Sequence, residues 1–220
     1  EELMQLDADL IVTAAYGQFL PTKFLNSPRF GAVNVHASLL PKYRGGAPIH
    51  YAIMNGDKET GVTIMRMVAK MDAGAIISQR AIPITGEDDV ASMFEKLSII
   101  GADLLIETLP ALFAGTITEV EQDEALVSFS PNISREQEQI DWNKTATEVD
   151  CFVRGLRPWP TSFTILNGNR VKMWGVALTS KETTKAPGSL FVEGGRLYVA
   201  CGSGTVLEIT RLQPAGKAQM

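Results

Sequence analysis

Three residues in the first half of the chain, Asn34, His36 and Asp72, carry side chains suited to acyl transfer. An amine that attacks a formyl carbon creates a tetrahedral oxyanion, which hydrogen bonds from an amide and a protonated imidazole would stabilise. Asn34 and His36 could supply these two donors. A carboxylate such as Asp72 could hold the imidazole in place and relay the proton of the amine, directly or through water.

The elements that must position these residues are visible as short apolar runs. Asn34 and His36 lie two residues apart in the run 32–36, and side chains at this spacing share one face of a strand. Further strands are predicted at 10–15, 60–67 and 76–84, followed by a long helix that ends near Gly115. Strands and a helix in this order predict an α/β catalytic domain over 1–117 with a mainly parallel sheet. Open sheets of this kind bind ligands at the carboxyl ends of their strands.

The rest of the chain has a different pattern. Residues 118–134 are polar and aperiodic, which predicts a linker. Residues 135–220 contain a short helix around 146–153 and several short apolar runs joined by tight turns, such as Asn167-Gly168 and Gly194-Gly195. These features predict a small antiparallel, OB-like β-barrel domain that follows the α/β domain.

Composition narrows the classes of function. The 220 residues are 45% hydrophobic and 20% charged, which is typical of globular domains, and no apolar run approaches the roughly 20 residues that span a bilayer. Two histidines and two distant cysteines, Cys151 and Cys201, predict no metal site and a reducing, cytoplasmic compartment. Residues 1–125 carry a net charge of −8 and residues 126–220 carry +3, so only the second part is suited to a phosphate backbone. Unequal solvated faces would give the same asymmetry.

The stretch Asn34-Val35-His36-Ala37-Ser38-Leu39-Leu40-Pro41 resembles the signature of folate-dependent formyltransferases, and Asp72 lies in a matching Asp-Ala-Gly. The resemblance implies a Rossmann-like core whose N-terminal part is missing here, and 10-formyltetrahydrofolate as the formyl donor without a metal. It makes Asn34, His36 and Asp72 the catalytic residues, and it implies a cis Leu40–Pro41 bond. The residues that it assigns to folate binding are Ser38, Leu39, Leu40, Pro41, Tyr16, Gly17, Leu20 and Met71.

Within that family the chain resembles the methionyl-tRNA branch most. The similar stretches are Arg44-Gly45-Gly46-Ala47-Pro48-Ile49, Ile140-Asp141-Trp142, Arg154-Gly155-Leu156-Arg157-Pro158-Trp159-Pro160 and Leu212-Gln213-Pro214-Ala215-Gly216-Lys217. This resemblance implies that a monomer acts on initiator methionyl-tRNA, with the barrel domain in contact with the tRNA. Arg44, Arg154 and Arg157 are the candidates for contact with tRNA phosphates.

Other interpretations stay open at this point. An Asn-x-His pair on a strand, or an Asp in a loop, is more often structural than catalytic when it occurs alone, and His50 on a predicted helix is interpreted as structural. A formyltransferase for a sugar-nucleotide amine such as UDP-aminoarabinose would share the three polar residues. A formyl-folate hydrolase would replace the amine by water. The barrel could also be an RNA-binding module on an inactive α/β scaffold.

Overall fold

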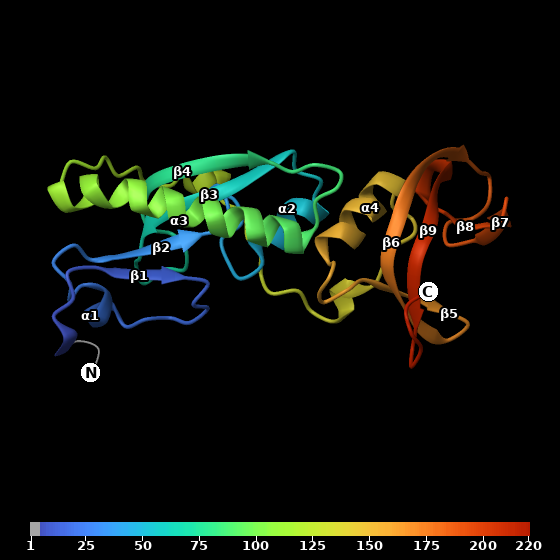
Figure 1. Ribbon diagram of the computed structural model, residues 1–220, viewed down its shortest axis with the longest axis horizontal. Coiled ribbons are helices and arrows are strands. Elements are labelled where there is room, and N and C mark those ends of the chain that lie inside the picture. The colour runs from blue at the N-terminus through green and yellow to red at the C-terminus, as the bar shows by residue number, and fades with distance from the viewer. Residues whose placement is uncertain (1–4) are drawn as a thin grey trace. The chain divides into compact units, whose positions relative to one another are not determined.

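The computed structural model describes residues 5–220, which divide into two compact units (Figure 1). Unit 1 comprises residues up to 49, 58–84 and 93–132, and unit 2 comprises 50–57, 85–92 and 133–220. The predicted domains were continuous, whereas two short segments of the first half belong to unit 2. Most of the predicted linker, 118–132, belongs to unit 1.

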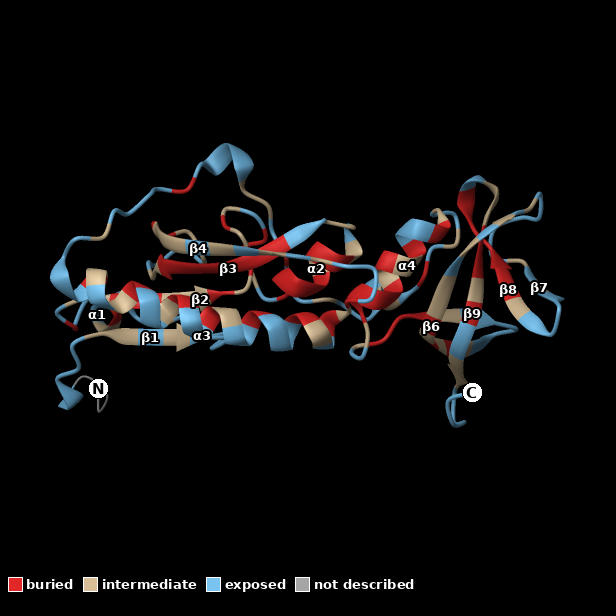
Figure 2. Ribbon diagram, turned by 45° about the horizontal axis from the view of Figure 1, so that its top comes forward, coloured by how far each residue is buried: buried red, intermediate tan, exposed pale blue. Residues whose placement is uncertain are grey.

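Unit 1 is built on a four-stranded sheet in the order β1-β2-β3-β4. Its strands are β1 (Ile11–Ala14), β2 (Ala32–His36), β3 (Glu59–Arg66) and β4 (Ile76–Pro83). β1 pairs with β2 in parallel, but β2–β3 and β3–β4 are antiparallel. The prediction of a mainly parallel sheet is therefore wrong for the described strands. The apolar runs indicated buried strands, as β3 is in Figure 2, but burial does not distinguish the two directions of pairing.

Helix α3 (Val90–Ala114) covers one face of this sheet. A Cβ atom on Gly101 would lie 3.0 Å from Val35 Cγ1 and 3.6 Å from Val62 Cγ1, so the helix approaches β2 and β3 closely at this glycine. Val35 therefore faces α3, and its neighbours Asn34 and His36 point to the opposite face. α3 is long and apolar enough to cross a membrane by length and composition alone.

Two short helices complete the first half of the chain: α1 (Thr22–Leu25) and α2 (Pro48–Met54). Three-residue 3-10 helices occur at Glu124–Leu126, Glu136–Glu138 and Gly202–Gly204. The first of these lies in the predicted linker, so that segment has regular structure of its own.

Unit 2 combines helix α4 (Ala146–Gly155) with an antiparallel sheet in the order β5-β6-β9-β8-β7. Its strands are β5 (Phe163–Leu166), β6 (Asn169–Glu182), β7 (Leu190–Glu193), β8 (Arg196–Ala200) and β9 (Thr205–Pro214). A capping box between Thr145 and Glu148 begins α4. The helix packs Val149 and Val153 into a core shared with Met173 and Leu207.

Both tight turns predicted from glycine pairs are confirmed. Asn167-Gly168 and Gly194-Gly195 all have positive φ, between 48° and 79°, as hairpin turns of the primed type require. They join β5 to β6 and β7 to β8. The end strands β5 and β7 do not pair with each other among the described residues, so the sheet is open and a closed OB-like barrel is not confirmed.

Candidate active site

Asn34 is held with its amide group ready to donate. The parallel register sets Thr13 of β1 opposite Asn34 of β2, and the Thr13 hydroxyl donates a 2.8 Å hydrogen bond to Asn34 Oδ1. Because the side-chain oxygen of Asn34 is occupied in this way, its NH₂ group is the part that can donate to a reacting oxygen.

His36 is buried at the carboxyl end of β2, with 6% of its surface exposed. Its Nε2 lies 2.9 Å from the main-chain oxygen of Tyr43, and a carbonyl oxygen only accepts, so Nε2 carries a hydrogen. In the neutral ring this assignment leaves the lone pair on Nδ1. That atom lies 3.8 Å from Asp72 Oδ1, which is within ion-pair range but too long for a direct hydrogen bond. Nδ1 can therefore take up a proton beside a carboxylate.

Asp72 lies in the loop that joins β3 to β4, and its carboxylate is only slightly exposed. Its Oδ2 accepts a 2.9 Å hydrogen bond from the main-chain N–H of Gly45. The residue has a φ of 50°, in the left-handed region that non-glycine residues rarely occupy. The loop thus keeps its main chain in an uncommon conformation while the carboxylate faces His36.

The turn that follows His36 is locked by buried polar contacts. Ser38 Oγ donates to the main-chain oxygen of Lys42 at 2.6 Å, and Thr63 Oγ1 donates to the oxygen of Ser38 at 2.6 Å. The main-chain N–H of Leu40 in turn donates to Thr63 Oγ1. Leu40–Pro41 is cis, as the resemblance implied. This turn is a fixed part of unit 1 that lies directly after His36.

The predicted linker supplies a wall of this site, which the sequence analysis missed. The segment 44–47 forms main-chain hydrogen bonds with 128–130, and the isolated bridge Arg44–Phe129 is parallel. A Cβ atom on Gly45, whose φ is 122°, would lie 2.7 Å from Ser130 O, so only glycine fits at this contact. Aperiodic polar sequence gives no signal for such a pairing, because the bridged residues Arg44 and Phe129 are 85 positions apart.

Two of the three arginines predicted to contact tRNA are buried. Arg44 has 0% exposure and donates to Gln122 Oε1 at 2.8 and 3.0 Å and to Glu124 Oε1 at 3.0 Å. Arg154 has 9% exposure and donates to Asp150 Oδ2 and to the main-chain oxygen of Asp88. Each guanidinium serves an internal network, so burial disfavours contact of these two residues with tRNA phosphates.

Arg157 is more accessible, with its side chain 23% exposed. Its Nε donates to Asp89 Oδ2 at 2.8 Å, and its Nη1 donates to the main-chain oxygen of Trp174. Its contact with tRNA stays a prediction. Glu124, at the exposed end of the Arg44 network, has a lowered pKa because it accepts hydrogen bonds from Arg44 and Lys70.

Of the residues predicted to line the pteridine pocket, Tyr16, Gly17 and Met71 are exposed. β1 and β2 are parallel, so the loop with Tyr16 and Gly17 leaves the sheet at the same edge as His36. Tyr16 is 53% exposed, and Met71, next to Asp72, is 47% exposed. Leu20 is partly buried. Apolar surface beside a polar site is suited to a flat heteroaromatic ligand.

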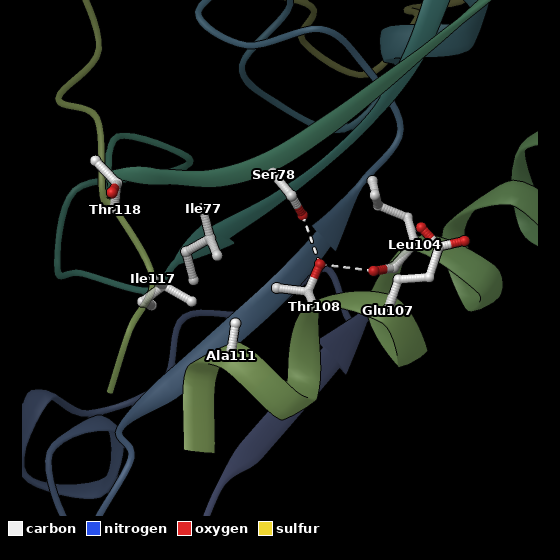
Figure 3. A pocket seen from close by; sticks show the side chains of 8 residues that line it. All are labelled: Ile77, Ser78, Leu104, Glu107, Thr108, Ala111, Ile117 and Thr118. Atoms are coloured by element: carbon white, nitrogen blue, oxygen red, sulfur yellow. Dashed lines mark hydrogen bonds between the residues drawn. The ribbon is translucent and has the colours of Figure 1, made fainter. Parts of the chain in front are cut away.

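A cavity of about 260 Å³ lies elsewhere in unit 1 (Figure 3). Its walls come from β4, α3 and the start of the 116–132 segment, and they contain a hydrogen bond between Ser78 and Thr108. None of the predicted site residues lines it. The cavity is therefore separate from the site around His36.

Comparison with known proteins follows the division of the chain. Residues 1–109 match the family model described as formyl transferase, and residues 132–220 match the formyl transferase C-terminal domain. A methionyl-tRNA formyltransferase of Enterococcus faecalis is 63% identical over all of this chain and 71% of its own length. Those of Levilactobacillus brevis and Listeria innocua are 58% and 53% identical, and the chain covers 69% and 70% of them.

Two solved structures share the fold. HypX from Aquifex aeolicus, in complex with tetrahydrofolic acid, gives a TM-score of 0.72 at 18% identity over 96% of this chain. The chain spans only 37% of the length of HypX. WlaRD, a sugar 3N-formyl transferase, gives a TM-score of 0.74 at 18% identity, with 98% of this chain and 77% of WlaRD covered.

Proposed function

The chain belongs to the methionyl-tRNA formyltransferase family, and from this premise we propose that it transfers the formyl group of 10-formyltetrahydrofolate to the free amine of initiator methionyl-tRNA. The observation that carries the proposal is the placement of His36 Nδ1 3.8 Å from Asp72, at the strand end that also presents Asn34. A buried imidazole beside a carboxylate at this distance is suited to proton transfer.

The chemistry follows from the three side chains. The methionyl amine attacks the formyl carbon, a C–N bond forms and the carbonyl oxygen becomes an oxyanion. The NH₂ group of Asn34 donates to this oxygen, and its orientation is already set by Thr13. The proton of the amine passes to His36 Nδ1, directly or through Asp72 or water. Collapse of the oxyanion then breaks the bond to N10 of the folate, which leaves with a proton as tetrahydrofolate.

The folate is proposed to lie against the turn 38–41, with its pteridine ring near Tyr16 and Met71. The solved relatives support this ligand class, since HypX was crystallised with tetrahydrofolic acid and WlaRD with 5-N-formyl-THF. The tRNA is proposed to contact unit 2, whose sheet is suited to an OB-like fold and whose largest segment, 133–220, lies in the part of the chain that carries the net charge of +3. We further propose that the protein acts as a cytoplasmic monomer.

One assay with two acceptors, and a third reaction without an acceptor, tests the proposal. Purified protein and 10-formyltetrahydrofolate are mixed with charged initiator tRNA, with UDP-aminoarabinose, or with no amine. We expect formyl-methionyl-tRNA to form and the other two reactions to stay at background. Transfer to the sugar nucleotide alone, or formate release without an amine, would contradict the proposal and favour a sugar formyltransferase or a hydrolase.

A further inference from the structure

Gln122 lies in the segment 110–131, which neither family model matches and which the sequence analysis interpreted mainly as linker. Its side chain is 8% exposed. The side-chain NH₂ group donates two hydrogen bonds of 2.8 Å, one to the main-chain oxygen of Asp72 and one to that of Gly74. One buried amide thus fixes the main chain on both sides of Ala73, within the loop that carries the Asp72 carboxylate.

The orientation of this amide is dictated by Arg44. A guanidinium only donates, so the two hydrogen bonds from Arg44 Nε and Nη2 must end on Gln122 Oε1. The NH₂ group must then face the two carbonyl oxygens, which only accept. Because Arg44 has 0% exposure, water does not compete for these contacts.

The turn 43–45 holds His36 and Asp72 at the same time. The main-chain oxygen of Tyr43 accepts from His36 Nε2, and the main-chain N–H of Gly45 donates to Asp72 Oδ2. Arg44, between them, holds the main chain of Asp72 through Gln122. The imidazole, the carboxylate and the Asp72 loop are therefore all hydrogen-bonded to one turn, directly or through Gln122. These contacts fix their relative positions.

This loop needs such support, because Asp72 has a φ of 50°. Non-glycine residues adopt this region uncommonly, and they keep it where the surroundings impose it. The two hydrogen bonds from Gln122 end on Asp72 itself and two residues later, where they oppose relaxation of the loop.

We propose that Gln122 is a positioning residue for formyl transfer, which holds the Asp72 loop so that the carboxylate stays beside His36. This inference rests on the proposed function of the site. It assigns a role in the reaction to a segment outside both family models. Gln122 acts through Asp72 and does not itself contact the reacting atoms.

The test compares Gln122→Leu, which keeps the volume but none of the hydrogen bonds, with Gln122→Glu, which can still accept from Arg44 but cannot donate to the loop. We expect kcat for formyl transfer to fall about 10- to 100-fold in both, with little change in KM for folate or tRNA, since small misplacements of catalytic groups have effects of this size. Gln137→Leu is the matched control. Gln137 likewise uses both ends of its amide, accepting from the main-chain N–H of Ser134 and donating to the Tyr51 hydroxyl, but these contacts are exposed.

Two further readouts separate positioning from general stability. In an Asp72→Asn background, Gln122→Leu should cause no further loss of kcat, because both changes act on the same group. The main-chain N–H of Gly45 donates a hydrogen bond to Asp72 Oδ2. Hydrogen exchange at this N–H should therefore be faster in both Gln122 variants. If Gln122→Leu unfolds below the assay temperature, the kcat of Gln122→Glu and its hydrogen exchange at Gly45 still test the proposal.

Wild-type kcat in both Gln122 variants, with unchanged exchange at Gly45, would overturn the inference while leaving the proposed function intact. Additive losses in the double variant would also overturn it, since they would show that Gln122 acts independently of Asp72. A wild-type protein that fails to formylate charged tRNA would instead contradict the proposed function. The exchange measurement would then still report on the Asp72 loop.

Discussion

The two histidines of this chain are almost equally buried but have different surroundings. His36 in unit 1 is 6% exposed, and its ring nitrogens face Tyr43 O and the Asp72 carboxylate. His50 in unit 2 is 4% exposed, and its ring lies against Trp159 with centroids 4.6 Å apart. Among the described residues, His50 Nε2 has no hydrogen-bond partner.

This contrast shows that neighbours, more than burial, decide what a histidine can do. Burial lowers the pKa of His50, and a hydrogen bond to the main chain of Trp159 only partly opposes that shift. Burial thus disfavours the cationic form of His50, whose ring is suited to packing. His36 has the Asp72 carboxylate within ion-pair range of Nδ1, so it is suited to proton transfer.

The largest expected effect separates the two histidines by activity. His36→Ala should lower kcat for formyl transfer by about 10³-fold, as expected for loss of a general acid–base. His50→Phe, which keeps a ring against Trp159, should leave kcat close to that of the wild type. Single-turnover formylation of charged initiator tRNA measures both. Equal losses of kcat in His36→Ala and His50→Phe would contradict the assignment of proton transfer to His36 alone.

The next effect concerns the oxyanion. Asn34→Ala should lower kcat by about 10²-fold with little change in folate binding, because its NH₂ group is proposed to donate mainly to the oxygen that becomes charged. Asn169→Ala, at an exposed amide in unit 2, is the control. A loss confined to KM would show that Asn34 binds substrate without favouring the transition state.

A smaller effect is expected at the residue that orients Asn34. Thr13→Val keeps the shape but removes the 2.8 Å hydrogen bond to Asn34 Oδ1, and kcat should fall about tenfold, the value of one hydrogen bond. Thr13→Ser should restore most of the rate. Retention of full activity by Thr13→Val would mean that the Asn34 amide does not need this support.

The smallest effect is a change in stability with pH at His50. Its pKa is lowered in the folded state, so below about pH 6.5 the unfolded chain binds a proton that the folded chain does not. The free energy of unfolding should therefore fall as the pH drops below that value, by at most about 1.4 kcal/mol per pH unit for one group. His50→Phe should reduce this slope. Urea unfolding at several pH values measures it, and an unchanged slope in the variant would contradict the assignment.

Local sequence patterns predicted the parts of the site that lie on one strand and its turn. The spacing of Asn34 and His36 gave their shared face, and the glycine pairs in unit 2 gave the two hairpins. What could not be predicted depends on contacts distant in the chain. The sequence predicts Arg44 as a contact for tRNA phosphates, because nothing around it in the sequence marks Gln122 as its partner. The antiparallel pairing of β3 was missed for the same reason.

In the proposed reaction, an amide, an imidazole and a carboxylate meet at the formyl group of a bound folate. The most direct test is a crystal structure of the protein with 5-formyltetrahydrofolate. We expect the formyl oxygen within about 3.2 Å of Asn34 Nδ2, the usual limit for an N–H···O hydrogen bond, with His36 facing the formyl carbon. A folate bound away from the β2 end, for example in the cavity beside Ser78 and Thr108, would contradict the account.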